Sequence, residues 1–103
     1  MSVAERLTGT WRLRWWESTS PDHDTVMPLG PSPDGLLVYA ADGTMLTCMA
    51  RGDRTPFASP DLLGGTDLEK LGAIDSFIAY GGGWQVEGDE VIHTVEASLF
   101  PNW

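Results

Sequence analysis

Hydrophobic and polar residues alternate from Thr10 to Glu17, and this alternation predicts the first strand. Side chains along a strand alternate between its two faces with a period of two residues. One face therefore carries Trp11, Leu13, Trp15 and Glu17, and the other carries Arg12, Arg14 and Trp16. We expect the first of these faces to point inward. A capping box, S-x-x-E at Ser2 to Glu5, predicts a short helical turn before the strand.

Residues 18–35 interrupt this pattern with four prolines and two glycines. Proline lacks the backbone donor that helices and sheets need, so the segment is predicted to be a long loop without regular structure. Loops of this length inside a compact domain are either functional lids or disordered segments. Both interpretations stay open, with the lid favoured.

Residues 36–50 read as a hairpin, because Asp42-Gly43 lies between two apolar runs and is a strong signal for a tight two-residue turn. Such a turn places Ala41 opposite Thr44. One face then carries Leu37, Tyr39, Leu46 and Cys48, and the other carries Leu36, Val38, Ala40, Met45, Thr47 and Met49. Since both faces are apolar, a helix, a lid or another chain must cover the outer one. We expect the methionine face to line the interior.

A second irregular segment, residues 51–65, precedes another capping box at residues 66–69. The box predicts a short helix. Apolar residues recur in it about every three positions, at Leu68, Leu71, Ile74 and Phe77. This stripe predicts a helix that plugs or flanks a sheet, although Gly72 weakens it.

The chain becomes strand-like again from Ile78, with Gly88-Asp89 as the turn of a second hairpin. If Glu87 pairs with Glu90, then Trp84 faces His93 and Gly82 faces Val95 on one surface. His93 would lie inside, against Trp84. The three glycines at 81–83 predict a bulge, a sharp bend or a close approach of another group to the backbone.

Length, charge and cysteine content limit the domain organisation, the classes of binding partner and the cellular compartment. The 103 residues are expected to form one domain, 1–103. Fifteen acidic and six basic residues give a net charge of −9, which argues against nucleic acid and anionic membranes. A single cysteine excludes an internal disulfide and favours a reducing compartment. With no apolar run long enough to span a bilayer and no leader-like start, we expect a cytoplasmic protein.

Several motifs together resemble a known family. They are Gly9-Thr10-Trp11, the segment PLGPSPDGLLVY with the Y-x-A-D-G turn, the segment PFASPDLLGGT, and the terminal H-x-x-E-x-S-x-x-P-N-W. From Leu7 to Trp103 the chain resembles the bacterial lipocalin-like domain family. The resemblance implies an all-β fold, a small antiparallel barrel with a hydrophobic cavity and with Trp11 near its closed end. It also implies binding of small apolar molecules, while related barrels act as cofactor-free cyclases or isomerases.

The resemblance also implies strands beyond the P-N-W motif, where this sequence stops. Five predicted strands are fewer than the eight or so that close a barrel around a small ligand. We therefore expect a partial, lipocalin-like barrel with one short helix and with unpaired edges. The prediction is a homodimer that pairs through open sheet edges. A truncated fragment is the alternative.

The candidate site residues follow from the inward faces. Those expected to contact a ligand are Trp11, Trp15, Glu17, Met45, Met49, Tyr80, Trp84 and His93. Catalytic candidates are His93 as a proton shuttle and Tyr39 and Tyr80 as donors to an oxyanion. The plainer interpretations are a hydrogen-bonded core histidine and, for Glu17, a strand-end carboxylate in solvent. His23 lies in a D-H-D triplet without a third ligand, so no metal is expected. No cofactor is expected either.

Three functions stay open at this stage. The first is binding of a small hydrophobic metabolite, with a polycyclic one as a possibility, in a cavity rich in aromatic side chains and methionine. The second is cofactor-independent cyclisation or isomerisation of a natural-product intermediate in such a cavity. The third is a non-binding structural or assembly module that pairs through its edge.

Overall fold

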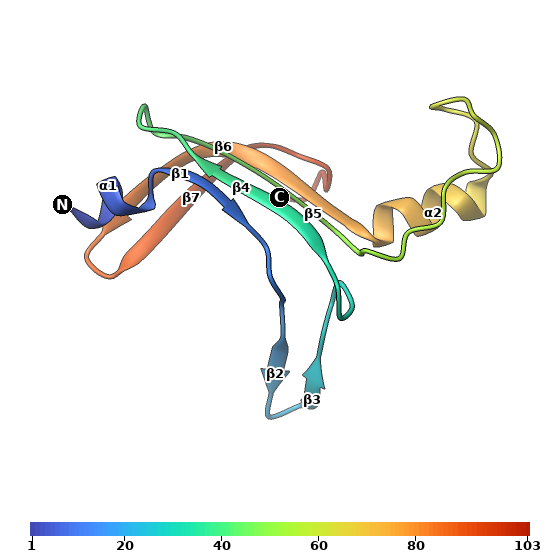
Figure 1. The fold of residues 1–103 in the computed structure, drawn as a ribbon, viewed down its shortest axis with the longest axis horizontal. Coiled ribbons are helices and arrows are strands. Elements are labelled where there is room, and N and C mark those ends of the chain that lie inside the picture. Colours follow the sequence, from blue (N-terminus) through green and yellow to red (C-terminus); the bar gives the residue numbers. More distant parts are fainter.

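A computed structural model describes residues 1–103, and most of its regular structure is strand (Figure 1). A curved, five-stranded antiparallel sheet forms the body, and a two-stranded sheet projects from it. In chain order the elements are α1 (Val3–Leu7), β1 (Gly9–Arg12), β2 (Ser18–Ser20), β3 (His23–Val26), β4 (Asp34–Tyr39), β5 (Thr44–Ala50), α2 (Asp67–Asp75), β6 (Phe77–Glu87) and β7 (Glu90–Ser98). The all-β prediction with a partial barrel is confirmed.

The order of strands in the main sheet is β1-β4-β5-β6-β7, so β1 and β7 are its two edges. β1 ends at Arg12, and the predicted strand to Glu17 is wrong in its second half. The partner strand explains this early end. Leu13 still donates its backbone N–H to the Gly35 carbonyl, but β4 begins only at Asp34, directly after a proline, so further residues have no strand to pair with.

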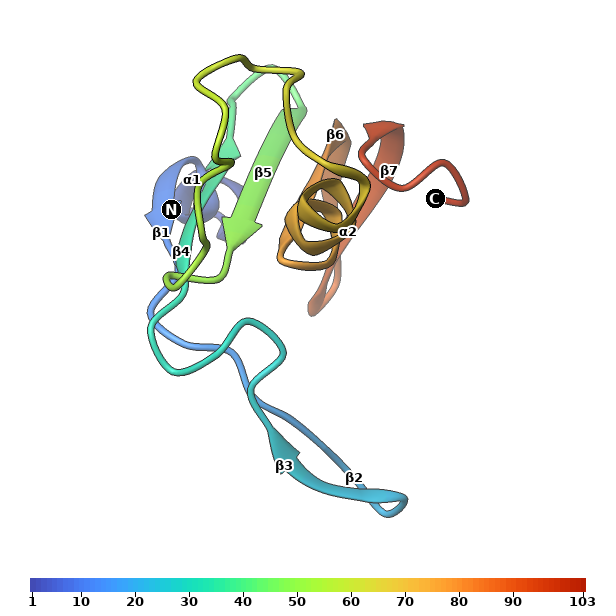
Figure 2. The same cartoon turned by 90° about the vertical axis from the view of Figure 1, so that its right-hand side faces the viewer.

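The segment predicted to lack regular structure contains a hairpin. β2 and β3 pair antiparallel across a turn at Pro21-Asp22, and the hydroxyls of Thr19 and Thr25 lie 2.6 Å apart across the pair. Figure 2 shows this hairpin standing away from the main sheet. The prolines flank the two strands rather than interrupting them, which is why their number did not prevent pairing.

β4 and β5 form the predicted hairpin with a register that differs by one residue. Tyr39 lies opposite Met45, where the two-residue turn predicted Leu46. The loop is longer by one residue, because Ala40 donates its N–H to the Thr44 carbonyl and Gly43 has a φ of 90°. A glycine in this left-handed conformation is typical of a three-residue hairpin loop with a bulge.

The shifted register changes which side chains share a face. One face, here called the inner face, carries Leu37, Tyr39, Met45, Thr47 and Met49. The opposite, outer face carries Leu36, Val38, Leu46 and Cys48. The methionines do lie inward, as the location of Met45 (1% exposed) shows. Tyr39 joins them, whereas the sequence had placed it on the other side.

β6 and β7 pair as predicted, with Glu87 opposite Glu90 and Trp84 opposite His93. The register shifts at Gly81/Gly82, so the predicted bulge at the glycine triplet is confirmed. A side chain at Gly82 would overlap the Thr94 carbonyl, which shows the close approach of the two backbones. Glycine is therefore required where β6 crosses the bulge.

α2 has the predicted capping box, with Thr66 accepting from the Glu69 N–H and Glu69 accepting from the Thr66 N–H. The prediction that its apolar stripe plugs or flanks the sheet is wrong. α2 lies beyond the end of β6 (Figure 1), and Leu68 is 80% exposed. Leu71 of the stripe is also exposed, whereas Ile74 and Phe77 line a hollow between α2 and the segment before it rather than the sheet face.

Little of the chain is buried. Only 8 of 103 residues are, and the buried apolar ones are Leu29, Tyr39 and Met45. The radius of gyration is 16.1 Å, whereas a compact domain of this length has about 13 Å. The core therefore consists of the inner face of an open sheet, and large apolar side chains remain exposed around it. No helix is long and apolar enough to cross a bilayer.

Candidate functional site

Two tyrosines hold one histidine on the inner face of the sheet. The Tyr39 hydroxyl lies 2.6 Å from Nε2 of His93, and the Tyr80 hydroxyl lies 2.9 Å from Nδ1 of the same ring. Both ring nitrogens therefore have a hydrogen-bond partner. We call these three residues the Tyr-His-Tyr network.

The strand pairing brings the network together from three different strands. Tyr39 lies on β4, Tyr80 on β6 and His93 on β7. Trp84, directly opposite His93, packs against Tyr39 with ring centroids 4.4 Å apart. The Trp84 indole N–H donates to the Ala40 carbonyl at 2.8 Å, which fixes the ring that supports Tyr39. Trp84 is thus a positioning residue.

Partial burial keeps all three members of the network neutral. Desolvation lowers the pKa of His93 from its ordinary value, because a less polar surrounding disfavours the charged imidazolium. Desolvation also raises the pKa of Tyr80. Burial raises the pKa of Tyr39, and repulsion from a charged Tyr80 raises it further. At neutral pH the network consists of two phenols and one uncharged imidazole.

An apolar cavity of about 260 Å³ lies beside the network. Its walls come from all five strands of the main sheet, and Tyr80 and His93 are the two members of the network among them. They are Trp11, Arg12, Leu13, Leu36, Leu37, Thr47, Met49, Tyr80 and His93. The Thr47 hydroxyl is already engaged, since it donates to the Leu36 carbonyl at 2.9 Å. Tyr80 and His93 are therefore the polar groups that distinguish this cavity from ordinary packing.

The candidate residues divide between the cavity, its support and other places. Trp11, Met49, Tyr80 and His93 line the cavity. Tyr39, Met45 and Trp84 lie behind it, within the packing that supports the network. Trp15 and Glu17 neither line the cavity nor support the network. Trp15 is 64% exposed, because the chain leaves the sheet after β1, and Glu17 is also exposed.

Sequence reasoning missed Leu13, Leu36, Leu37 and Thr47 as part of the lining. The predicted register put Leu37 on the face opposite the methionines. The signal that would have found it is the glycine of the three-residue loop, which sets Leu37 opposite Thr47. Arg12 was assigned to the outward face and lines the cavity from the edge strand, as does its partner Leu36, whose register belongs to the outer face.

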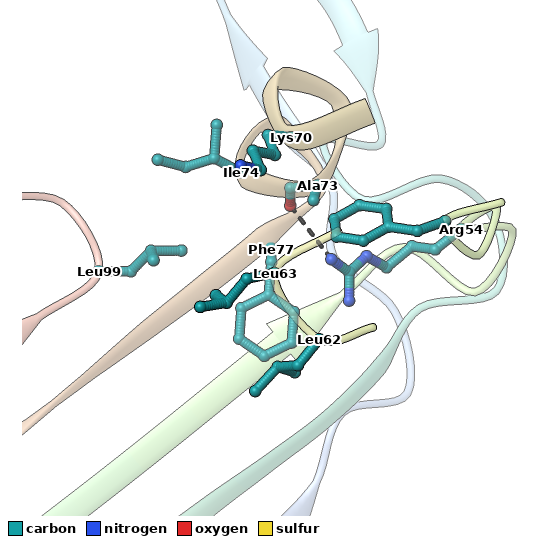
Figure 3. A pocket seen from close by; sticks show the side chains of 9 residues that line it. Arg54, Leu62, Leu63, Lys70, Ala73, Ile74, Phe77 and Leu99 are labelled. Carbon is teal, nitrogen blue, oxygen red and sulfur yellow. Dashed lines mark hydrogen bonds between the residues drawn. The ribbon is translucent and has the colours of Figure 1, made fainter. Parts of the chain in front are cut away.

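A larger hollow, of about 510 Å³, lies between α2 and the segment before it (Figure 3). There the Arg54 guanidinium lies 5.0 Å from the centre of the Phe77 ring and donates to the Ala73 carbonyl. Two wall residues, Leu62 and Leu63, are 88% and 82% exposed. This hollow is open at the surface, and its only titratable wall residues, Arg54 and Lys70, are both basic. It has no hydrogen-bonded group like the Tyr-His-Tyr network, so we take the smaller cavity as the candidate site.

No group of three or more histidine, cysteine, aspartate or glutamate side chains is arranged to hold a metal ion. His23 lies at the start of β3, and its Nδ1 is 2.7 Å from the Asp24 carbonyl oxygen. The D-H-D triplet thus forms a local turn contact.

Comparison with known proteins gives one match. A family model described as a lipocalin-like domain matches residues 8–103, nearly the whole chain. Neither the curated proteins nor the solved structures include one that matches.

Proposed function

The chain belongs to the lipocalin-like domain family, and on that premise we propose that it binds a small, largely apolar molecule in the cavity beside the Tyr-His-Tyr network. The observation that carries the proposal is an apolar cavity with a few convergent polar groups, which is the usual composition of a small-molecule site. At about 260 Å³ the cavity is slightly smaller than the usual range for such sites, about 300–1,000 Å³. The size favours a ligand of one or two rings.

Calorimetric titration of the protein with ethylnaphthalene, an apolar bicyclic probe, tests this proposal. We expect saturable binding with a stoichiometry of one probe per cavity. We also expect a negative heat-capacity change, because apolar surface is buried. Absence of saturable binding to the folded protein would overturn the proposal and would favour a non-binding assembly module.

Catalysis is the second candidate function. The observation that favours it is the contact of both tyrosine hydroxyls with His93, since such a chain can hold and pass a proton. In this function His93 takes a proton from a substrate carbon, Tyr80 hydrogen-bonds the oxyanion that forms, and His93 returns the proton to a second substrate atom. This sequence gives isomerisation or cyclisation without a cofactor. Tyr39 does not line the cavity, so its role is to hydrogen-bond His93 rather than to contact the substrate.

Deuterium uptake measures this activity without knowledge of the natural substrate. If the network moves protons, acetylnaphthalene in heavy water should gain deuterium in its methyl group faster with the protein than in buffer. His93→Gln should return the rate to that of buffer while circular dichroism shows an unchanged fold. Equal rates in the two proteins would remove His93 from the mechanism.

We further propose that two copies pair through an open edge of the main sheet. Both β1 and β7 have a neighbour on one side only, and β7 is the longer, with nine residues. An unpaired edge offers backbone donors and acceptors to a second chain. The low burial and the large radius of gyration favour such a partner, since they leave apolar surface available.

Light scattering should therefore give about twice the chain mass of 11.2 kDa. Hydrogen exchange then locates the interface. Amides of β7 that point away from β6 should become slower to exchange as protein concentration rises, whereas amides of the β2–β3 hairpin should not change. A single species with the mass of one chain at all concentrations would refute the dimer.

A further inference from the structure

Deepening the proposed function, we infer that the Tyr-His-Tyr network is polarised in one direction. Tyr39 donates to Nε2 of His93, Nδ1–H donates to the Tyr80 oxygen, and the Tyr80 hydroxyl presents its proton to the cavity. The ligand class that matches this arrangement is an apolar ring compound with a carbonyl or similar acceptor oxygen. The inference rests on the proposed function for its ligand, while the direction of the network stands on its own.

The first step is the count of donors. A neutral imidazole carries one N–H donor and one acceptor nitrogen. Tyrosine hydroxyls lie at both nitrogens of His93. One tyrosine must therefore donate to the ring, and the other must accept from it. The accepting tyrosine keeps its own proton free for a third group.

Burial decides which tyrosine donates to the ring. Tyr39 is 7% exposed and does not line the cavity, and its hydroxyl has no hydrogen-bond partner besides His93. If Tyr39 accepted from the ring, its own proton would be buried without an acceptor, which folded proteins avoid. Tyr80 lines the cavity, so its proton can reach a ligand or solvent. The free proton therefore belongs to Tyr80.

The two distances are consistent with this direction. To an oxygen acceptor, hydroxyl donors form shorter hydrogen bonds than N–H donors, with typical heavy-atom separations of about 2.7–2.8 Å and about 2.9–3.0 Å. The Tyr39 contact measures 2.6 Å and the Tyr80 contact 2.9 Å. The shorter bond thus matches a hydroxyl donor, and the longer one matches an N–H donor.

The surroundings of Tyr80 define the ligand class. Thr47 is engaged with the Leu36 carbonyl, and Arg12 is an exposed residue of the edge strand. Apart from Thr47, Arg12, His93 and Tyr80 itself, the wall residues are apolar or aromatic. An acceptor oxygen beside Tyr80 with an apolar ring system against Leu37 and Met49 satisfies both parts of the lining.

Nuclear magnetic resonance tests the direction without any ligand. The nitrogen chemical shifts of a histidine ring distinguish the protonated nitrogen from the bare one, and His93→Gln identifies which of the two histidines gives each signal. We expect His93 to be protonated at Nδ1 at neutral pH. Protonation at Nε2 would overturn the inference, because Tyr39 would then be the acceptor.

A matched pair of probes tests the ligand class. Acetylnaphthalene and ethylnaphthalene have nearly the same shape, and only the first has an acceptor oxygen. Tyr80→Phe should weaken binding of acetylnaphthalene about tenfold, as expected for one lost hydrogen bond, and change ethylnaphthalene less than twofold. Tyr39→Phe removes the same atom from a residue outside the cavity lining, so acetylnaphthalene should lose less affinity than with Tyr80→Phe.

The outcomes separate the inference from the proposed function. If wild-type protein binds both probes and Tyr80→Phe weakens both equally or neither, the assignment of Tyr80 as the ligand donor is wrong. If the folded wild-type protein binds neither probe, the proposed function fails, while the tautomer of His93 still decides the direction of the network. Circular dichroism confirms that each variant is folded.

Discussion

Replacing Gly82 by alanine is expected to destabilise the fold by about 3 kcal/mol or more. The added Cβ would overlap the Thr94 carbonyl oxygen and lie 2.9 Å from the Glu96 nitrogen. Both are backbone atoms held by the pairing of β6 with β7, so neither can rotate away as a side chain would. Overpacking in a rigid environment costs about 1–3 kcal/mol, and more where the backbone itself must move. A domain with a total stability of about 5–15 kcal/mol loses much of it.

Gly72→Ala is the matched control for this change. Gly72 lies in α2, and a Cβ there meets nothing within 4 Å. The same substitution should therefore stabilise the protein slightly, by about 0.5–1 kcal/mol, because alanine favours helix. Thermal and urea unfolding of both variants measure the difference. A Gly82→Ala protein as stable as wild type would show that β6 and β7 do not approach each other as closely at the bulge.

Leu37→Trp is expected to weaken binding of ethylnaphthalene at least tenfold. Leu37 forms part of the cavity wall, opposite Thr47 on the inner face. An indole there occupies the space of a bicyclic probe in a cavity of only about 260 Å³. A tenfold loss corresponds to about 1.4 kcal/mol of binding free energy. Calorimetric titration of the folded variant measures it.

Leu46→Trp makes the same chemical change on the other side of the sheet. Leu46 lies on the outer face and is 62% exposed, so a larger side chain there meets no wall of the cavity. The affinity for ethylnaphthalene should stay within twofold of wild type. If Leu46→Trp weakens binding and Leu37→Trp does not, the ligand lies on the outer face, and the proposed site is wrong.

The elements that the sequence predicted best are those set by local chemistry. Both capping boxes form, since each needs only a hydroxyl and a carboxylate three residues apart. The turn at Gly88-Asp89 joins β6 and β7 in the predicted register because Gly88 supplies a positive φ of 59°. These features depend on few residues that are close in sequence.

The hairpin of β4 and β5 shows the limit of such signals. Asp42-Gly43 predicts a turn, but the dipeptide fits both a two-residue loop and a three-residue loop with glycine at its last position. Only the pairing of Ala40 with Thr44 distinguishes the two. A shift by one residue moves every side chain to the other face. Tyr39 was therefore expected on the wrong face.

Contacts between distant segments explain the remaining differences. The residues from Thr10 to Glu17 alternate as described, but a strand also needs a partner, and β4 begins only at Asp34 and offers none before it. The apolar stripe at α2 covers no part of the sheet face, because Leu68 and Leu71 are exposed and Ile74 and Phe77 line the hollow beside the helix. In the site, the sequence predicted that Trp84 lies opposite His93, because one turn sets the register of β6 and β7. The contact of Tyr39 with His93 could not be predicted in this way, because it depends on three successive strand pairings between β4 and β7.

The hairpin of β2 and β3 has an evolutionary consequence. Its strands pair only with each other, and it makes no extensive contact with the sheet. Changes in its length or composition therefore leave the pairing of the main sheet and the cavity intact. Residues of the hairpin can therefore be substituted without affecting the rest of the fold. Substitutions at the glycines of β6 need compensating changes in β7, because the two backbones approach each other closely there. Sequence diversity among relatives should accordingly concentrate in residues 18–26.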